Sequence, residues 1–249
     1  MVEIIPAIIP KSFSDLKEKL SLVSGLAPLV QIDISDGKFT KNLTWPFKGH
    51  PMSTWTSNVQ VTNLDPDFIK IIKEEEGFPF WQDLEFETHL MVENPEAEIQ
   101  KWISAGAKRV LVHYESFDGP EKVLNFCKNF KEKYAVGYIN IELGIALNLE
   151  TDTKVLEPLI THINFIQLMS ISKIGFQGIG IPFELEVLDK INALHSMFHD
   201  LIISVDGGIN LGNAKSVIDA GANRLIIGGA IFQSENIRKT ISEFKELVI

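Results

Sequence analysis

Residues 201–208, Leu201-Ile202-Ile203-Ser204-Val205-Asp206-Gly207-Gly208, form a short apolar run that ends in a carboxylate and a glycine pair. A related pattern returns at residues 224–229, Arg224-Leu225-Ile226-Ile227-Gly228-Gly229. Apolar runs without alternation are typical of parallel strands buried on both faces. Two such strands in succession, each followed by glycines, are typical of the part of a parallel α/β barrel that holds a phosphate beside a reactive group. The stretch therefore predicts chemistry on a small phosphorylated molecule.

Strand-like and helix-like segments alternate along the whole chain, which is the pattern of parallel βα units. The length of 249 residues agrees with one (β/α)8 barrel. We therefore predict an α/β fold, a TIM barrel, as a single domain over residues 1–249. Its eight strands are expected at residues 4–9, 29–34, 84–91, 109–114, 142–147, 164–170, 201–205 and 224–227.

The connection between the second and third expected strands, residues 35–83, is enlarged and contains Trp45, Trp55 and Trp81. Within it, Asp65 followed by Pro66 predicts the start of a helix, with an N-cap and a proline in the first turn. Long insertions in barrels tend to lie at the active face or at a subunit contact, and extra packing on the barrel rim fits equally well. We expect a homo-oligomer.

The charge and composition limit the partners. The formal net charge is -10 and the isoelectric point is near 5.1, so nucleic acids and anionic membranes would be repelled. No uncharged apolar run approaches the roughly 18 residues that span a bilayer, and the N-terminal residues lack the pattern of a secretory signal. A single cysteine, Cys127, excludes disulfides within the chain. These features predict a cytoplasmic protein with no nucleic-acid or membrane partner.

Polar side chains gather at the expected carboxyl ends of the strands, where barrels place their active sites. Gln31 and Asp33 share one face of the second strand, His89 lies at the end of the third, and Asp206 ends the seventh. Two carboxylates across a pocket suit removal of a proton from one face of a carbon and its return to the other. Asp33, His89 and Asp206 also suit a divalent metal acting as a Lewis acid. His113, at the end of the fourth strand, is interpreted as structural.

The glycines form a second group. Gly207 and Gly208 follow the seventh strand and Gly228 and Gly229 the eighth, where barrels commonly hold a phosphate on backbone N–H groups. Gly178 belongs to a glycine-rich run after the sixth strand that could close over the same phosphate. Three sets of glycines on adjacent strands predict a phosphate site.

Six stretches, spread in order over nearly the whole chain, carry a family resemblance. They are Asp33-Ile34-Ser35-Asp36-Gly37-Lys38-Phe39, His89-Leu90-Met91-Val92-Glu93-Asn94-Pro95, Gly144-Ile145-Ala146-Leu147-Asn148, Leu168-Met169-Ser170, Val205-Asp206-Gly207-Gly208-Ile209-Asn210 and Gly228-Gly229-Ala230-Ile231-Phe232. In this order they resemble the ribulose-phosphate 3-epimerase family. The resemblance implies a ribulose-phosphate-binding barrel that epimerises C3 of a ketopentose phosphate, with metal assistance, through a cis-enediolate.

The resemblance also implies roles for single residues. Asp33 and Asp206 would be the acid and base and would bind the metal, with His89 as a third ligand. Met91 and Met169 would line the pocket beside the enediolate, and the glycine pairs would hold the phosphate.

Three positions depart from the family pattern. Gln31 stands where the family has a histidine ligand, Pro10 where it has a pocket serine, and Ser35 where it has a pocket methionine. After the sixth strand, Ser172-Lys173-Ile174 replaces an Asn-Pro pair. An amide oxygen is a poor zinc ligand. The identity of the divalent metal (zinc, manganese, iron or magnesium), its occupancy and the exact sugar phosphate therefore stay open.

Two other functions fit parts of the pattern. A decarboxylase or aldolase-like lyase of this barrel type would use Asp-x-Lys-x-x-Asp after a strand, and Asp33-Ile34-Ser35-Asp36 lacks the lysine. A phosphate-sugar-binding barrel that has lost epimerase activity agrees with Gln31 and Pro10. The main prediction is an epimerase-like isomerase acting on ribulose 5-phosphate or a related ketose phosphate.

Overall fold

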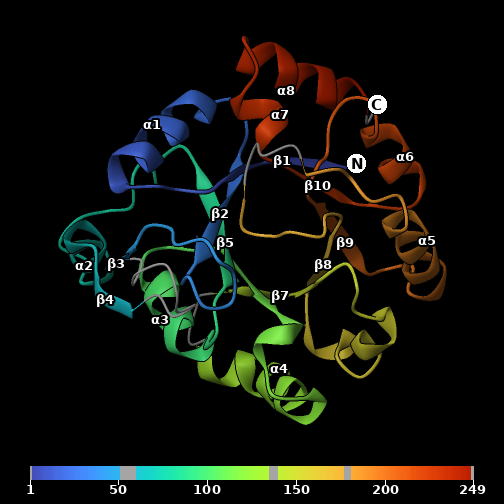
Figure 1. Cartoon of the computed structure of the whole chain (residues 1–249), viewed down its shortest axis with the longest axis horizontal. Helices are drawn as coiled ribbons and strands as arrows, with labels where there is room; N and C mark the ends of the chain where they lie inside the picture. Colours follow the sequence, from blue (N-terminus) through green and yellow to red (C-terminus); the bar gives the residue numbers. More distant parts are fainter. Residues whose placement is uncertain (1, 51–59, 135–139, 177–180, 248–249) are drawn as a thin grey trace.

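The computed structural model describes residues 2–50, 60–134, 140–176 and 181–247, and its centre is a closed barrel of eight strands (Figure 1). Neighbouring strands pair in parallel in the order β1-β10-β9-β8-β7-β6-β5-β2. The predicted barrel is confirmed, and each observed strand end lies within one residue of the predicted one. The strands are β1 Glu3–Ile8, β2 Leu29–Ser35, β5 Glu85–Met91, β6 Arg109–His113, β7 Glu142–Leu147, β8 Phe165–Met169, β9 Ile202–Asp206 and β10 Arg224–Ile227.

Helices surround the barrel (Figure 1). Ser12 caps α1 by accepting the Asp15 N–H. Asp65 caps α2 ahead of Pro66, as predicted. In the part of the chain that the structure describes, no helix is long and apolar enough to cross a membrane. The α-helices are α1 Phe13–Val23, α2 Pro66–Ile72, α3 Glu96–Ser104, α4 Pro120–Tyr134, α5 Val187–Met197, α6 Ala214–Asp219, α7 Gly229–Phe232 and α8 Ile237–Glu246, and the 3-10 turns are η1 Tyr114–Ser116, η2 Thr153–Leu156 and η3 Ile160–His162.

The long connection between β2 and β5 holds a hairpin and a helix. β3, Phe47–His50, pairs antiparallel with β4, Gln60–Leu64, and α2 follows. Trp45 is buried and packs against aromatic rings of α1, α2 and α3, so this part of the connection contributes packing at the rim. Trp81 is 65% exposed, and Trp55 lies outside the described residues.

Side chains that point into the barrel form layers along its axis, because alternate residues of each strand face inward. At the amino ends of the strands, Arg109 bridges Glu3 and Glu87, with 3.3 Å between the paired atoms in both cases, and Arg224 joins Glu3 at 3.1 Å. Apolar side chains such as Phe165 lie further along the axis. The polar residues predicted to be functional lie near the carboxyl ends of the strands.

Candidate active site

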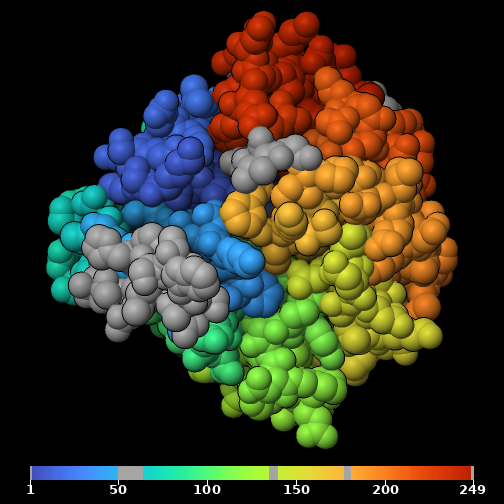
Figure 2. Space-filling view, viewed as in Figure 1, coloured from blue at the N-terminus to red at the C-terminus, as the bar shows by residue number. Residues whose placement is uncertain are grey.

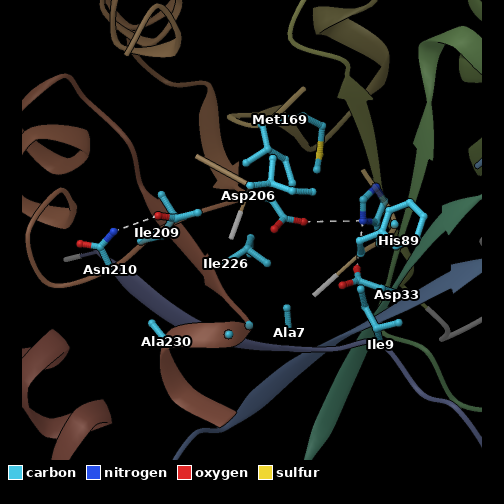
Figure 3. Close-up of a pocket in the computed structure, with 18 of the residues that line it drawn as sticks. Ala7, Ile9, Asp33, His89, Met169, Asp206, Ile209, Asn210, Ile226 and Ala230 are labelled. Atoms are coloured by element: carbon cyan, nitrogen blue, oxygen red, sulfur yellow. Dashed lines mark hydrogen bonds and ion pairs between the residues drawn. The ribbon is translucent and has the colours of Figure 1, made fainter. Parts of the chain in front are cut away.

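A cavity of about 410 Å³ lies at the carboxyl ends of the strands (Figure 3). Asp33, His89 and Asp206 line one side of it, while Asn210 and Ala230 lie at the other (Figure 3). The lining also includes predicted residues from the ends of two strands and from the glycine turns: Met91, Met169, Gly207, Gly208, Gly228 and Gly229.

Strand register brings the three candidate ligands together. Asp33 of β2 lies beside His89 of β5, and Gln31 points into the barrel two residues earlier on β2. Asp206 approaches from the end of β9, which lies three strands from β2 around the closed barrel. One ligand atom from each of Asp33, His89 and Asp206 can be chosen so that all three lie within 4.8 Å of one another. The predicted convergence of these side chains on one cavity is therefore present in the structure.

The Gln31 side-chain amide lies between the two aspartates. Its Nε2 donates to Asp33 Oδ1 at 2.8 Å and to Asp206 Oδ2 at 3.0 Å, and it lies 3.4 Å from His89 Nδ1. His89 Nδ1 also faces Asp33 Oδ1 at 3.0 Å. Gln31 and His89 are fully buried. The N–H groups of the Gln31 amide therefore place partial positive charge between the two carboxylates in a buried environment.

His113 lies in direct contact with the site histidine. His89 Nε2 and His113 Nε2 are 2.9 Å apart, and His113 Nδ1 is 3.1 Å from Glu115 Oε2. Both rings are fully buried, and Phe39 packs on His113 with ring centroids 4.9 Å apart. The sequence offered the signal in the pair His113 and Glu115, two residues apart at a strand end, but His113 was interpreted as structural.

The environment shifts the pKa of several of these groups. Burial, followed by the charge of Asp33, raises the pKa of Asp206 to about 7. Burial alone would lower the pKa of His89, but the hydrogen bond and charge of Asp33 outweigh it, so that the net shift is upward. Burial lowers the pKa of His113 to about 4 despite its hydrogen bond to Glu115. A pair of close carboxylates with one raised pKa is suited to hold one proton between them near neutral pH.

This arrangement agrees with comparisons to known proteins. Residues 3–232 match the family model described as "Ribulose-phosphate 3 epimerase family". The chain belongs to the ribulose-phosphate 3-epimerase family. The resemblance seen in the sequence is thereby confirmed, and the protein is an isomerase-type enzyme of this family.

Relatives of similar length support the assignment to this epimerase family. The chain is 28% identical to "Ribulose-phosphate 3-epimerase" of Bacillus subtilis (strain 168), with 98% of this chain and 99% of that protein covered. It is also 28% identical to the protein of the same name from Synechocystis sp., with 97% and 92% covered. Among solved structures, 3-hexulose-6-phosphate synthase from Salmonella typhimurium shares the fold, with a TM-score of 0.64, 13% identity, and 99% and 98% of the two chains covered.

Gln167 is a site residue that the sequence reasoning missed in this epimerase-family chain. It is fully buried on β8, and its Nε2 donates to Asp206 Oδ2 at 2.9 Å, the same oxygen that accepts from Gln31. Two amides therefore hold Oδ2, which leaves Oδ1 as the freer oxygen of Asp206. The available signal was a polar residue inside an otherwise apolar strand, two residues before Met169 and hence on the same face.

The glycine turns shape the far end of the cavity. Gly207 and Gly208 have φ of 118° and 63°, values that L side chains rarely adopt. A Cβ on Gly207 would also lie 2.7 Å from the side chain of Ile171. The carbonyl of Gly208 accepts from Asn210 Nδ2 at 3.1 Å and from Asn213 Nδ2 at 3.0 Å. Backbone thus lies directly against the cavity at these positions, while the predicted Gly178 falls outside the described residues.

Two other predicted pocket residues, Pro10 and Ser35, are buried but are not among the described residues that line the cavity. The Ser35 hydroxyl donates to the Asn42 carbonyl at 2.6 Å and contacts the Thr40 hydroxyl, and the Pro10 carbonyl accepts from the Trp45 N–H at 2.9 Å. Both residues therefore hold the segment after β2, because their polar groups turn toward that segment.

The segment after β2 meets the segment after β8 over the barrel. Asn42 Nδ2 donates to the Gly175 carbonyl at 2.6 Å. Figure 2 shows the same meeting, with the blue residues after β2 and the gold residues after β8 touching at the centre of this face. A Cβ on Gly175 would lie 2.8 Å from the Thr40 hydroxyl oxygen, so the close approach requires glycine.

The donor set fits a divalent cation. Asp33, His89 and Asp206 offer two oxygens and one nitrogen, and the buried Gln31 Oε1 has no hydrogen-bond partner among the described groups. A half-turn of the Gln31 amide would exchange Nε2 for Oε1 and add an oxygen ligand. Because oxygen would then dominate the set, hard cations such as Mn²⁺ or Mg²⁺ would be favoured over Zn²⁺.

Proposed function

We propose that this enzyme epimerises C3 of a ketose phosphate, ribulose 5-phosphate or a close relative, through an enediolate. The observation that carries the proposal is the convergence of Asp33 and Asp206 on one cavity from two strands that are not neighbours, β2 and β9, with His89 Nδ1 3.0 Å from Asp33 and 3.7 Å from Asp206. Two carboxylates in such an arrangement can reach the same carbon from opposite faces. That reach is the requirement for inversion by proton removal and return.

The proton transfer needs one carboxylate and one carboxylic acid at the start. The raised pKa of Asp206, about 7, allows it to hold a proton at neutral pH while Asp33 is the base. Asp33 would take the C3 proton from one face, and Asp206 would give its proton to the other face of C3. Their protonation states are then exchanged, and the reverse reaction uses them in the opposite roles.

Gln31 and Gln167 keep Asp206 ready for this transfer. Both donate to Oδ2, at 3.0 and 2.9 Å, so the side chain cannot rotate without losing two hydrogen bonds. Oδ1 is then the oxygen left for the substrate. A bound divalent cation, held by Asp33, His89 and Asp206, would supply Lewis-acid stabilisation to the oxygens of the enediolate.

The rest of the cavity suits a phosphorylated sugar. Met91 and Met169 provide apolar, polarisable walls beside the carboxylates. Gly208, Gly228 and Gly229 leave backbone exposed to the cavity, so backbone N–H groups can bind a phosphate without a cationic side chain. A phosphate at this side would point the carbon chain of the sugar toward the aspartates.

The test is uptake of solvent deuterium at C3 of ribulose 5-phosphate, measured with and without Mn²⁺, Mg²⁺ or Zn²⁺. We expect exchange by the unaltered protein, and a loss of about 10²-fold to 10⁴-fold in Asp33→Asn and in Asp206→Asn. Asp219→Asn, an exposed carboxylate paired with Lys215, is the matched control and should exchange normally.

Each alternative function has its own signature in this experiment. Binding of the sugar phosphate without exchange in the unaltered protein, under every metal condition, would identify a binding barrel that has lost turnover. Release of a shorter sugar phosphate together with a one-carbon product would identify a lyase. Exchange into another ketose phosphate only would keep the mechanism and change the substrate.

A further inference from the structure

We propose that Glu115 and His113 are positioning residues that fix the tautomer of His89, so that its Nδ1 presents a lone pair to the space between the two aspartates. The inference deepens the proposed function, because that nitrogen is one of the candidate metal ligands. It depends on a chain of contacts that leads from Glu115, in η1, through the His113 ring to His89 Nε2, while His89 Nδ1 faces Asp33.

Glu115 is held in one orientation. Its Oε1 accepts from the Asn148 backbone N–H at 2.9 Å and from the Thr151 hydroxyl. Its Oε2 faces His113 Nδ1 at 3.1 Å. An ionised carboxylate only accepts hydrogen bonds, so the hydrogen in this contact belongs to His113 Nδ1.

The position of the hydrogen on His113 determines the position of the hydrogen on His89. A neutral His113 with its hydrogen on Nδ1 has a bare Nε2, which lies 2.9 Å from His89 Nε2. Two ring nitrogens at this distance need one hydrogen between them, and it must then come from His89. Both rings are fully buried, so water does not compete for these positions. The neutral His89 therefore has its hydrogen on Nε2 and a bare Nδ1.

The bare nitrogen faces two carboxylates. His89 Nδ1 lies 3.0 Å from Asp33 Oδ1 and 3.7 Å from Asp206 Oδ2. The Gln31 Nε2 lies among these atoms, 2.8 Å from Asp33 Oδ1 and 3.0 Å from Asp206 Oδ2, and a half-turn of that amide would replace the donor by an oxygen. The resulting set of electron-rich atoms would suit a divalent cation. The opposite tautomer would place an N–H at this point, and an N–H cannot bind a cation. Glu115 thus determines, through the His113 ring, which nitrogen of His89 is available to bind a cation.

Glu115→Gln tests this assignment, because it reverses the polarity while keeping the shape. The amide oxygen can keep the bonds from Asn148 and Thr151, which directs the amide N–H toward His113 Nδ1. His113 then carries its hydrogen on Nε2 and donates to His89, which moves the His89 hydrogen to Nδ1. Partners that orient a metal-binding histidine typically change affinity by about 10-fold to 100-fold, so we expect Mn²⁺ affinity to fall at least about tenfold.

Two variants separate polarity from general damage. His113→Gln keeps the polarity, because its amide N–H can donate to Glu115 while its oxygen accepts from His89 Nε2, so its Mn²⁺ affinity should fall less than that of Glu115→Gln. Glu93→Gln removes a charge from the same face at an exposed ion pair with Lys38 and should bind Mn²⁺ normally. Binding of inorganic phosphate at the glycine turns should be unchanged in all three, which reports the intact fold.

The ring nitrogens give a readout that needs no metal. In ¹⁵N-labelled protein, the His89 Nε2 signal should be that of a protonated nitrogen in the unaltered chain and of a bare nitrogen in Glu115→Gln. Equal Mn²⁺ affinity in the two proteins, an equal loss in His113→Gln and Glu115→Gln, or an unchanged Nε2 signal would overturn the proposal. If the tautomer reverses in Glu115→Gln but the unaltered protein shows no deuterium exchange, the proposed function alone is refuted.

Discussion

Replacement of Asp206 by asparagine should remove activity and stabilise the fold. Burial and the charge of Asp33 disfavour the ionised form of Asp206 in the folded protein, and the raised pKa that results lets Asp206 donate a proton in the proposed reaction. The pKa of Asp206 is about 7 against an ordinary value of 3.8, owing to burial and then to the charge of Asp33. The difference between these two pKa values corresponds to about 4 kcal/mol as an upper limit. The side chain keeps 14% exposure, so water screens part of the effect, and we expect about 2 to 4 kcal/mol.

The pH dependence has a definite sign. A carboxyl with a raised pKa binds a proton in the folded state that the unfolded chain has already released, here between pH 3.8 and about 7. The free energy of unfolding of the native protein therefore falls as pH rises through this window, and stays lower above it. Asparagine has no proton to lose, and its oxygen can still accept from Gln31 and Gln167. The stability advantage of Asp206→Asn should thus be small at pH 4 and full at pH 8.

The assay is urea unfolding of both proteins at pH 4, 5, 7 and 8 with a chelator present, alongside deuterium exchange at C3. The exchange rate should fall by about 10²-fold to 10⁴-fold, as for loss of a general acid–base group. The exposed variant Asp219→Asn should change neither quantity. Equal stabilities of Asp206→Asn and the native protein at pH 8, or an advantage that does not change with pH, would refute the reasoning that burial and Asp33 strain Asp206.

Three further changes probe the metal site, the charged layer and the glycine turns. Gln31→His should raise metal affinity by at least about tenfold, because imidazole binds divalent metals better than an amide, and elemental analysis with competition titration checks it. Full zinc occupancy of the native protein would contradict this. Glu87→Gln should stabilise by about 2 to 3 kcal/mol at pH 8 and hardly at pH 4, because burial raises the pKa of Glu87 to about 7, so native stability falls between pH 4.5 and 7. A pH-independent difference in urea unfolding would oppose it. Gly229→Leu should weaken sugar-phosphate binding at least about tenfold, roughly 1.4 kcal/mol, by calorimetry. Unchanged affinity would indicate that the phosphate binds at other residues.

The barrel could be predicted because each strand is indicated by a short apolar run of consecutive residues, and this pattern repeats along the chain. Apolar runs such as residues 201–205 and 224–227 can only be buried on both faces, and a run ending in Asp206 or in Gly228 places that residue at the carboxyl end. Since all eight parallel strands end at the same rim, residues far apart in sequence must meet there. Asp33, His89 and Asp206 were found by this rule together with the acid–base and metal-ligand chemistry of their side chains.

The roles of other residues depended on contacts between strands. Gln167 was missed because nothing in β8 itself indicates that its amide lies across from Asp206, and this follows only from the pairing of β8 with β9. Pro10 and Ser35 were expected in the pocket, yet their polar groups are bonded to the segment after β2. Strand position fixes the face of a residue but not the partner of its side chain.

The amino-acid sequence by itself determined the barrel, the order of its strands and the carboxyl rim where the aspartates meet, because periodicity and closure leave few alternatives. The tertiary structure alone decided that Gln31 lies between the aspartates, and that His113 and Glu115 continue the hydrogen-bond chain from His89. The physical reason is the separation along the sequence of the residues involved. Burial patterns are local properties of a strand, whereas a hydrogen bond requires two atoms from distant strands to come within about 3 Å in a suitable orientation.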